Sequence, residues 1–198
     1  CMFEINELNL TEVHDFVFYM NDFYKDPDKI IDSLNLNAPS IHKWNTKNSK
    51  NTIDFIDCRH NLQSDDFKKT EIELYKFFKR DPAKAKGQVT TNYLKFIEKP
   101  PYENNYWWPH VDDCLYNCIV YLNKNGCDGT NLYNQYKENI YDEHVNPWVP
   151  KENYELLFNI TSKYNRLVVF PSNIYHGLAC NNEKFLSKFR KNQIIFIS

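Results

Sequence analysis

The chain has 198 residues and a mass of 23.8 kDa, which fits one domain with one hydrophobic core and makes a second domain unnecessary. Hydrophobic residues make up 42% of the chain and charged residues 25%, so a globular protein is expected rather than a disordered one. The formal net charge of −2 and the pI near 6.3 argue against nucleic acid as a partner, because binding a phosphate backbone needs a strong excess of basic residues.

The sequence also bears on the compartment. No apolar run approaches membrane-spanning length, and the first residues lack the pattern of a secretory signal. The six cysteines include no C-x-x-C pair, so the simplest interpretation is that their thiols are reduced. We therefore expect a soluble, cytoplasmic protein that does not bind membranes, and the sequence assigns it no oligomeric state.

A strand and a helix are predicted near the N-terminus. The aromatic-rich residues 14–20 are typical of a strand. Asp26 is a natural N-cap for the helix that follows, and Pro27 suits its first position. The apolar side chains of this helix recur on one face, at Ile30, Ile31 and Leu34.

Residues 37–63 show no clear period, and we interpret them as a long connection. Long irregular segments in compact domains often carry function, so this segment could form a wall of a substrate pocket, with Trp44 or Arg59 touching substrate. The same residues could equally belong to a surface loop anchored by its aromatic side chains. Ser64 then caps a second helix that is predicted to run to about Arg80.

The pattern changes to short β segments from residue 88 onward. Eight such segments suit a double-sheet jelly roll, that is, a double-stranded β-helix, with the N-terminal helices packed on one outer sheet. We therefore expect one domain, in which residues 1–87 support a core formed by residues 88–198. Residues 134–155 interrupt the strands as a lid-like insertion. The predicted strands cover residues 88–97, 106–112, 116–122, 129–133, 156–160, 166–170, 174–179 and 189–197.

Three residues form a candidate metal site. On a strand, alternate side chains share a face, so His110 and Asp112 are expected to project together. A distant histidine, His176, completes a set of two histidines and one carboxylate. This set is the facial triad that holds non-haem Fe(II) and leaves the opposite face of the ion open.

The landmarks behind the triad extend the pattern. The segment Tyr121-Leu122-Asn123 ends one predicted strand, and Gly129-Thr130 opens the next. Arg190 follows His176 by fourteen positions. In this order, over residues 88–198, the chain resembles the Fe(II)/2-oxoglutarate-dependent dioxygenases, and among them the prolyl-hydroxylase-like branch.

The resemblance implies an activity and its cosubstrates. His110, Asp112 and His176 would bind Fe(II), and the enzyme would use 2-oxoglutarate and O₂ and release succinate and CO₂. The product would be a hydroxylated prolyl residue, another peptide side chain or a free amino acid. By the same resemblance, Arg190 and Tyr121 would bind the distal carboxylate of 2-oxoglutarate, with Tyr93 as a further neighbour.

Two other functions remain open at this point. A cupin-like metal-dependent oxygenase that does not use 2-oxoglutarate would have the same architecture and no need of Arg190. A non-catalytic jelly-roll binding module would carry the histidines and Asp112 by coincidence, and it would show no stoichiometric affinity for iron.

Overall fold

A computed structural model gives the fold of the chain and describes residues 1–36, 40–44, 55–96, 103–138, 147–180 and 188–198. In these ranges the chain is mainly β structure, every pair of neighbouring strands is antiparallel, and there are two α-helices. None of the helices in these ranges is long and apolar enough to cross a bilayer.

The N-terminal segment forms a hairpin. Its strands are β1 (Thr11–His14) and β2 (Val17–Met20), which pair antiparallel. Between them Phe16 has φ 57°, in the left-handed region, and its N–H donates to the side chain of Glu12. The prediction of one strand over residues 14–20 is therefore wrong, because a turn divides the aromatic run.

Both helices begin at the predicted caps. Helix α1 spans Pro27–Leu36, and the Asp26 carboxylate accepts a hydrogen bond from the Lys29 N–H. Helix α2 spans Asp65–Phe77, and the Ser64 hydroxyl accepts from the second and third residues after it. The predicted caps are confirmed, and the second helix ends three residues before Arg80. Short 3-10 turns, η1 (Pro82–Lys84) and η2 (Lys151–Asn153), occur elsewhere in the chain.

The strands form one large sheet and two small ones. The large sheet has eight strands in the order β1-β2-β11-β7-β13-β5-β4-β3. Besides β1 and β2 it contains β3 (Ser40–Trp44), β4 (Phe55–Gln63), β5 (Gln88–Phe96), β7 (Tyr116–Tyr121), β11 (Leu167–Pro171) and β13 (Arg190–Ile197). A three-stranded sheet has the order β10 (Tyr154–Ile160), β8 (Thr130–Gln135), β12 (Tyr175–Leu178), and β6 (Asn105–Trp107) pairs with β9 (Trp148–Pro150).

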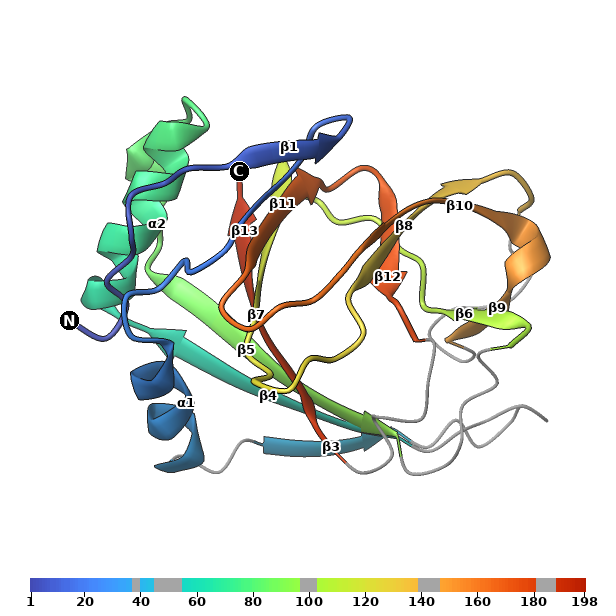
Figure 1. Ribbon diagram of the computed structural model, residues 1–198, viewed down its shortest axis with the longest axis horizontal. Coiled ribbons are helices and arrows are strands. Elements are labelled where there is room, and N and C mark those ends of the chain that lie inside the picture. The colour runs from blue at the N-terminus through green and yellow to red at the C-terminus, as the bar shows by residue number, and fades with distance from the viewer. Residues whose placement is uncertain (37–39, 45–54, 97–102, 139–146, 181–187) are drawn as a thin grey trace.

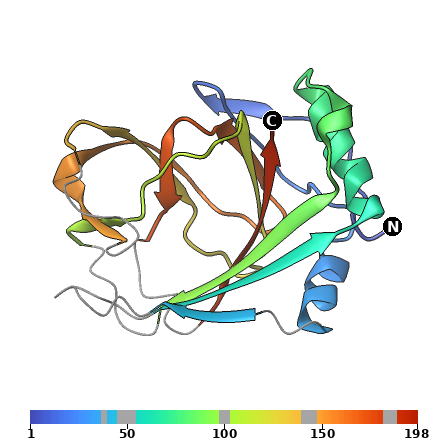
Figure 2. The same cartoon turned by 180° about the vertical axis from the view of Figure 1, so that it is seen from behind.

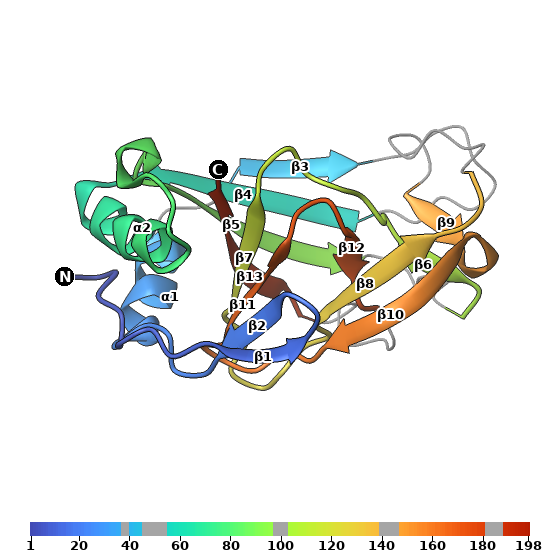
Figure 3. The same ribbon diagram turned by 90° about the horizontal axis from the view of Figure 1, so that it is seen from above.

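The two helices and the three-stranded sheet lie on opposite sides of the large sheet (Figures 1 and 3). This arrangement is of the β-sandwich or jelly-roll type. The lid-like insertion expected at residues 134–155 falls partly outside the described residues. Its described part contains β9, which pairs with β6.

The segment 37–63 contains two strands, so its interpretation as an irregular connection is wrong. β4 pairs with β5 along its whole length, from Phe55 opposite Phe96 to Gln63 opposite Gln88. Seen from behind, these long strands lie side by side across the molecule (Figure 2). The strand is stabilised by pairing with a neighbour distant in sequence, which the local pattern of β4 does not reveal.

Side chains on the large sheet alternate between two apolar clusters. On β7, Cys118 and Val120 belong to the core that includes Phe67, Leu74 and Tyr75 of helix α2. Ile119 and Tyr121 belong to a second cluster that includes Leu132 of β8. One face of the sheet therefore packs against the helices, and the other, called here the inner face, packs against the small sheet.

Candidate metal centre

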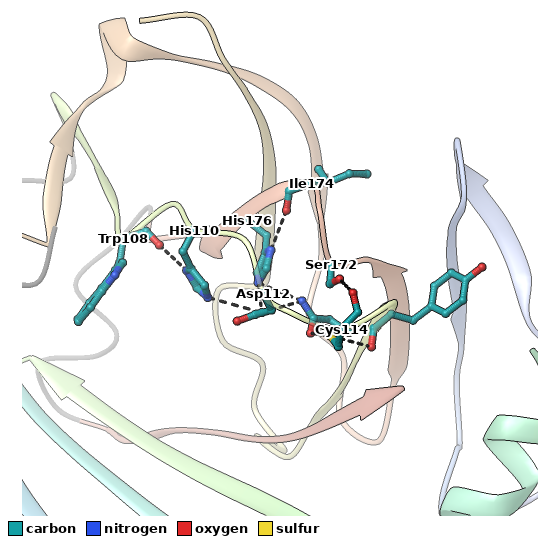
Figure 4. A network of polar contacts seen from close by, with 9 residues as sticks. Trp108, His110, Asp112, Cys114, Ser172, Ile174 and His176 are labelled. Atoms are coloured by element: carbon teal, nitrogen blue, oxygen red, sulfur yellow. Dashed lines mark hydrogen bonds and ion pairs between the residues drawn. The ribbon is translucent and has the colours of Figure 1, made fainter. Parts of the chain in front are cut away.

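His110 is held in place by an exchange of backbone hydrogen bonds with His176. The N–H of His110 donates to the carbonyl of His176 at 3.0 Å, and the N–H of His176 donates back at 2.9 Å. β6 ends at Trp107, and Trp108, with φ 41°, turns the chain out of that strand before Pro109. The predicted strand over residues 106–112 is therefore wrong beyond Trp107, although the two histidines lie side by side as expected (Figure 4).

A glycine permits this close approach. Any β-carbon at Gly177, directly after His176, would collide with the carbonyl oxygen of Trp107. Only glycine lets β12 lie this close to the segment that carries His110.

Asp112 comes from the loop after His110 rather than from a strand. Its N–H donates to the carbonyl of Ser172 at 3.0 Å, and the N–H of Ser172 donates to the carbonyl of Leu115 at 3.1 Å. The Ser172 hydroxyl also donates to the carbonyl of Cys114. Ser172 therefore fixes the loop that presents the Asp112 carboxylate, as Figure 4 shows.

The three side chains converge as the sequence predicts. One potential ligand atom from each of His110, Asp112 and His176 lies within 4.8 Å of the others. The Asp112 Oδ2 atom is 3.0 Å from Nε2 of His176 and 3.9 Å from Nε2 of His110. The residues were found from their spacing, and the structure brings them together.

Both imidazole rings are oriented by backbone carbonyls. Nδ1 of His110 contacts the carbonyl oxygen of Trp108 at 2.7 Å, and Nδ1 of His176 contacts that of Ile174 at 2.8 Å. A carbonyl oxygen only accepts, so in each ring Nδ1 carries the hydrogen. In the neutral form of each ring, Nε2 is then left with a lone pair directed at the site.

This donor set fits a metal ion. Two imidazole lone pairs and a carboxylate converge, and electron-pair donors at such distances repel one another unless a proton or a cation lies among them. A carbonyl on the outer nitrogen of each histidine is also the usual support for metal-ligating imidazoles. Histidine and carboxylate ligands in this number suit a first-row transition metal such as Fe(II).

The pKa shifts of His110 and Asp112 favour the protonation states that bind a metal ion. Burial lowers the pKa of His110, and the charge of His176 lowers it further. Burial alone would raise the pKa of Asp112, but its contacts with His176 and His110 outweigh burial and lower that pKa. A neutral His110 and an ionised Asp112 are the states that a metal ion requires.

Asn117, on the inner face of β7, is a site residue that the sequence did not single out. Its Nδ2 atom donates to Oδ2 of Asp112 at 2.8 Å and lies 3.2 Å from Nε2 of His176. The Cys114 thiol in turn lies 3.4 Å from Oδ1 of Asn117, which fixes the orientation of the amide. The available signal was its strand spacing, since Asn117 is two residues from Ile119 and four from Tyr121.

The structure brings Arg190 and Tyr121 together on the inner face. The Arg190 guanidinium carbon lies 5.6 Å from the centre of the Tyr121 ring, and only 7% of Arg190 is exposed. The guanidinium donates to the carbonyls of Asp128 and Gly129, each at 3.3 Å. The Tyr121 hydroxyl shares a 2.7 Å hydrogen bond with Thr130.

Tyr93 lies on the opposite face of the large sheet from Arg190 and Tyr121. It pairs with Lys191 across β5 and β13, and neighbours in such a pair share a face. Its ring packs in the helix-side core near Phe189, with ring centres 6.3 Å apart. Tyr93 therefore points away from Arg190, Tyr121 and the triad, and this placement removes it from the site.

The fold of the chain is similar to those of several solved structures. No family model and no curated protein matches the chain. The chain is similar to a Burkholderia pseudomallei oxidoreductase of the 2OG-Fe(II) oxygenase family, with 11% identity, a TM-score of 0.45, and coverage of 92% of this chain and 85% of that one. It is also similar to IDO from Bacillus thuringiensis, with 12% identity, a TM-score of 0.35, and coverage of 90% and 97%. Both TM-scores are below 0.5, so neither neighbour indicates a function for this chain.

Proposed function

We propose that the chain is an Fe(II)- and 2-oxoglutarate-dependent dioxygenase. It hydroxylates an unactivated C–H bond of a prolyl or other peptide side chain, or of a free amino acid. The observation that carries this proposal is the convergence of two oriented imidazoles and one carboxylate at His110, His176 and Asp112. The large and small sheets would be the two layers of a double-stranded β-helix around this centre.

The triad would hold Fe(II) by one face and leave the other face to the reactants. When bound, iron and 2-oxoglutarate supply the chemistry: O₂ gives one oxygen atom to the substrate C–H bond and the other to succinate, with loss of CO₂. The protein keeps both imidazoles in the ligating tautomer through the carbonyls of Trp108 and Ile174. Asn117 keeps the carboxylate of Asp112 in place.

Arg190 and Tyr121 would bind the distal carboxylate of 2-oxoglutarate. A buried guanidinium binds a carboxylate through charge-assisted hydrogen bonds. The backbone carbonyls of Asp128 and Gly129 hold this guanidinium in one orientation. When Thr130 donates to the Tyr121 oxygen, the phenol hydrogen is free to point at the carboxylate.

Anaerobic titration tests this function. Fe(II) and 2-oxoglutarate are added together, and the metal-to-ligand charge-transfer absorbance is followed, with succinate measured after O₂ is admitted. Wild type should give the band and release succinate, Asp112→Ala should give neither, and Tyr121→Phe should need more 2-oxoglutarate. Arg80, an exposed arginine three residues after the end of helix α2, provides the matched control Arg80→Met for Arg190→Met.

The outcomes separate the alternatives. Iron binding without any response to 2-oxoglutarate would replace the proposal with an oxygenase that does not use this cosubstrate. Absence of iron binding would leave a non-catalytic binding module.

A further inference from the structure

Asp57 and Arg59 of β4 are on the same face of the large sheet as the metal centre. The register pairs Arg59 with Asn92, Asn92 with Asn192, and Asn192 with Tyr121 across four adjacent strands. Register partners share a face, so Arg59 lies on the inner face with Tyr121. Asp57, two residues earlier on the same strand, shares it.

Asp57 orients the guanidinium of Arg59. Nε of Arg59 donates to Oδ2 of Asp57 at 3.2 Å, and the side chains are 60% exposed for Arg59 and 16% exposed for Asp57. Among the residues that the structure describes, the terminal nitrogens of Arg59 have no partner. A guanidinium held through Nε presents its two terminal nitrogens side by side, which is the geometry that binds a carboxylate.

The guanidinium of Arg59 is over the same face of the large sheet as the triad. That face carries Asn117 of β7, whose amide contacts both Asp112 and His176. A molecule held by Arg59 is therefore on the side of the sheet where the metal centre lies.

Hydrogen-bond acceptors adjoin Arg59. The Asp57 carboxylate is one, and the Oδ1 atom of Asn92, on the neighbouring strand, is buried and has no hydrogen-bond partner in the described chain. The pair thus offers donors for an anion and acceptors for a cationic N–H group. 2-Oxoglutarate has no N–H group, so this combination suits the substrate rather than the cosubstrate.

We propose that Arg59 and Asp57 bind the α-carboxylate and the α-ammonium group of a free amino acid, whose side chain then reaches the metal centre. This inference rests on the proposed function for the reaction at that side chain, and the binding itself needs only β4. Arg59 is the residue that selects a free carboxylate. Asp57 both positions Arg59 and accepts from the ammonium group.

The test is calorimetric titration of Co(II)-loaded protein with 2-oxoglutarate present and O₂ absent. The probes are the free L-amino acids, and each is compared with its α-carboxamide and its N-acetyl derivative. At least one amino acid should bind wild type, and Arg59→Met should weaken its binding roughly tenfold to a hundredfold, as expected for the loss of a charge-assisted hydrogen bond. The carboxamide should bind wild type poorly, and the control variant Arg80→Met should behave as wild type.

Three results would overturn the inference. They are no binding of any free amino acid, binding that is unaffected in Arg59→Met, and a loss of 2-oxoglutarate affinity in Arg59→Met in place of a loss of amino-acid affinity. Binding of a blocked prolyl peptide without binding of any free amino acid would count as the first of these results. Co(II) and 2-oxoglutarate affinities of wild type are measured in the same samples, so failure of the proposed function shows itself separately from failure at Arg59.

Discussion

Replacing Asn117 with alanine should weaken metal binding although Asn117 is not one of the three proposed ligands. The side chain is 2% exposed and donates to Oδ2 of Asp112, the oxygen that faces both histidines. Without this hydrogen bond the carboxylate is free to rotate away from the position in which it meets the metal ion. In the variant the Asp112 side chain therefore loses conformational entropy when the metal binds, and this loss lowers the metal affinity.

The size of the effect follows from the contact. A hydrogen bond to a charged group contributes about 1.5–3 kcal/mol, which corresponds to roughly a tenfold to 150-fold change in an equilibrium constant. Loss of a partner that orients a metal ligand typically costs about 10–100-fold in metal affinity. We therefore predict that Asn117→Ala binds Co(II) roughly tenfold to a hundredfold more weakly than wild type.

The assay is an anaerobic Co(II) titration followed by the visible absorbance of the bound ion, with a chelator as competitor. Asn134→Ala is the matched control, because Asn134 is an exposed asparagine whose amide donates to Glu155 on the neighbouring strand. Asn117→Ala should also change the shape of the Co(II) spectrum, which a purely structural loss of stability would not do. Equal affinity and an unchanged spectrum in Asn117→Ala would refute the role given to Asn117.

Three further predictions concern the cosubstrate, pH and the supporting helix. Arg190→Lys should bind Co(II) like wild type but 2-oxoglutarate more weakly, since lysine cannot form the paired hydrogen bonds of a guanidinium; equal 2-oxoglutarate affinity would contradict this. The pKa of His110 is lowered from 6.5, so just below that pH the unfolded chain binds a proton that the folded chain does not. The free energy of unfolding, measured with urea, should therefore fall between about pH 7.5 and about pH 6, and His110→Asn should reduce the fall. Ser64→Ala should lower the free energy of unfolding by about 1 kcal/mol through loss of the α2 cap. Its Co(II) affinity should equal that of wild type, because helix α2 and the metal centre are on opposite sides of the large sheet; a changed affinity would contradict this.

The sequence predicted the triad because its spacing carries the chemistry. His110, Asp112 and His176 were identified without knowledge of the fold, and the structure brings them together. Their local geometry was predicted less well. Asp112 is held by the loop at Ser172, a contact between residues far apart in the chain, and not by a strand shared with His110.

The misplaced elements have a common cause. β4 owes its strand conformation to β5, and Tyr93 faces the helices because the register of β5 directs it there. A shift of one residue along a strand moves a side chain to the opposite face, and spacing alone does not decide which face lies inside. Asn117 was overlooked for a related reason, since its partners Asp112 and Cys114 are brought to it by the fold.

Direct measurement of metal stoichiometry tests the central claim most simply. Fe(II) is titrated anaerobically into wild type, Asp112→Ala and Asp113→Ala, where Asp113 is the exposed neighbouring carboxylate. We predict one tightly bound ion per chain for wild type and Asp113→Ala, and none for Asp112→Ala. Equal binding by Asp112→Ala and wild type, or no binding by wild type, would contradict a metal centre at His110, Asp112 and His176.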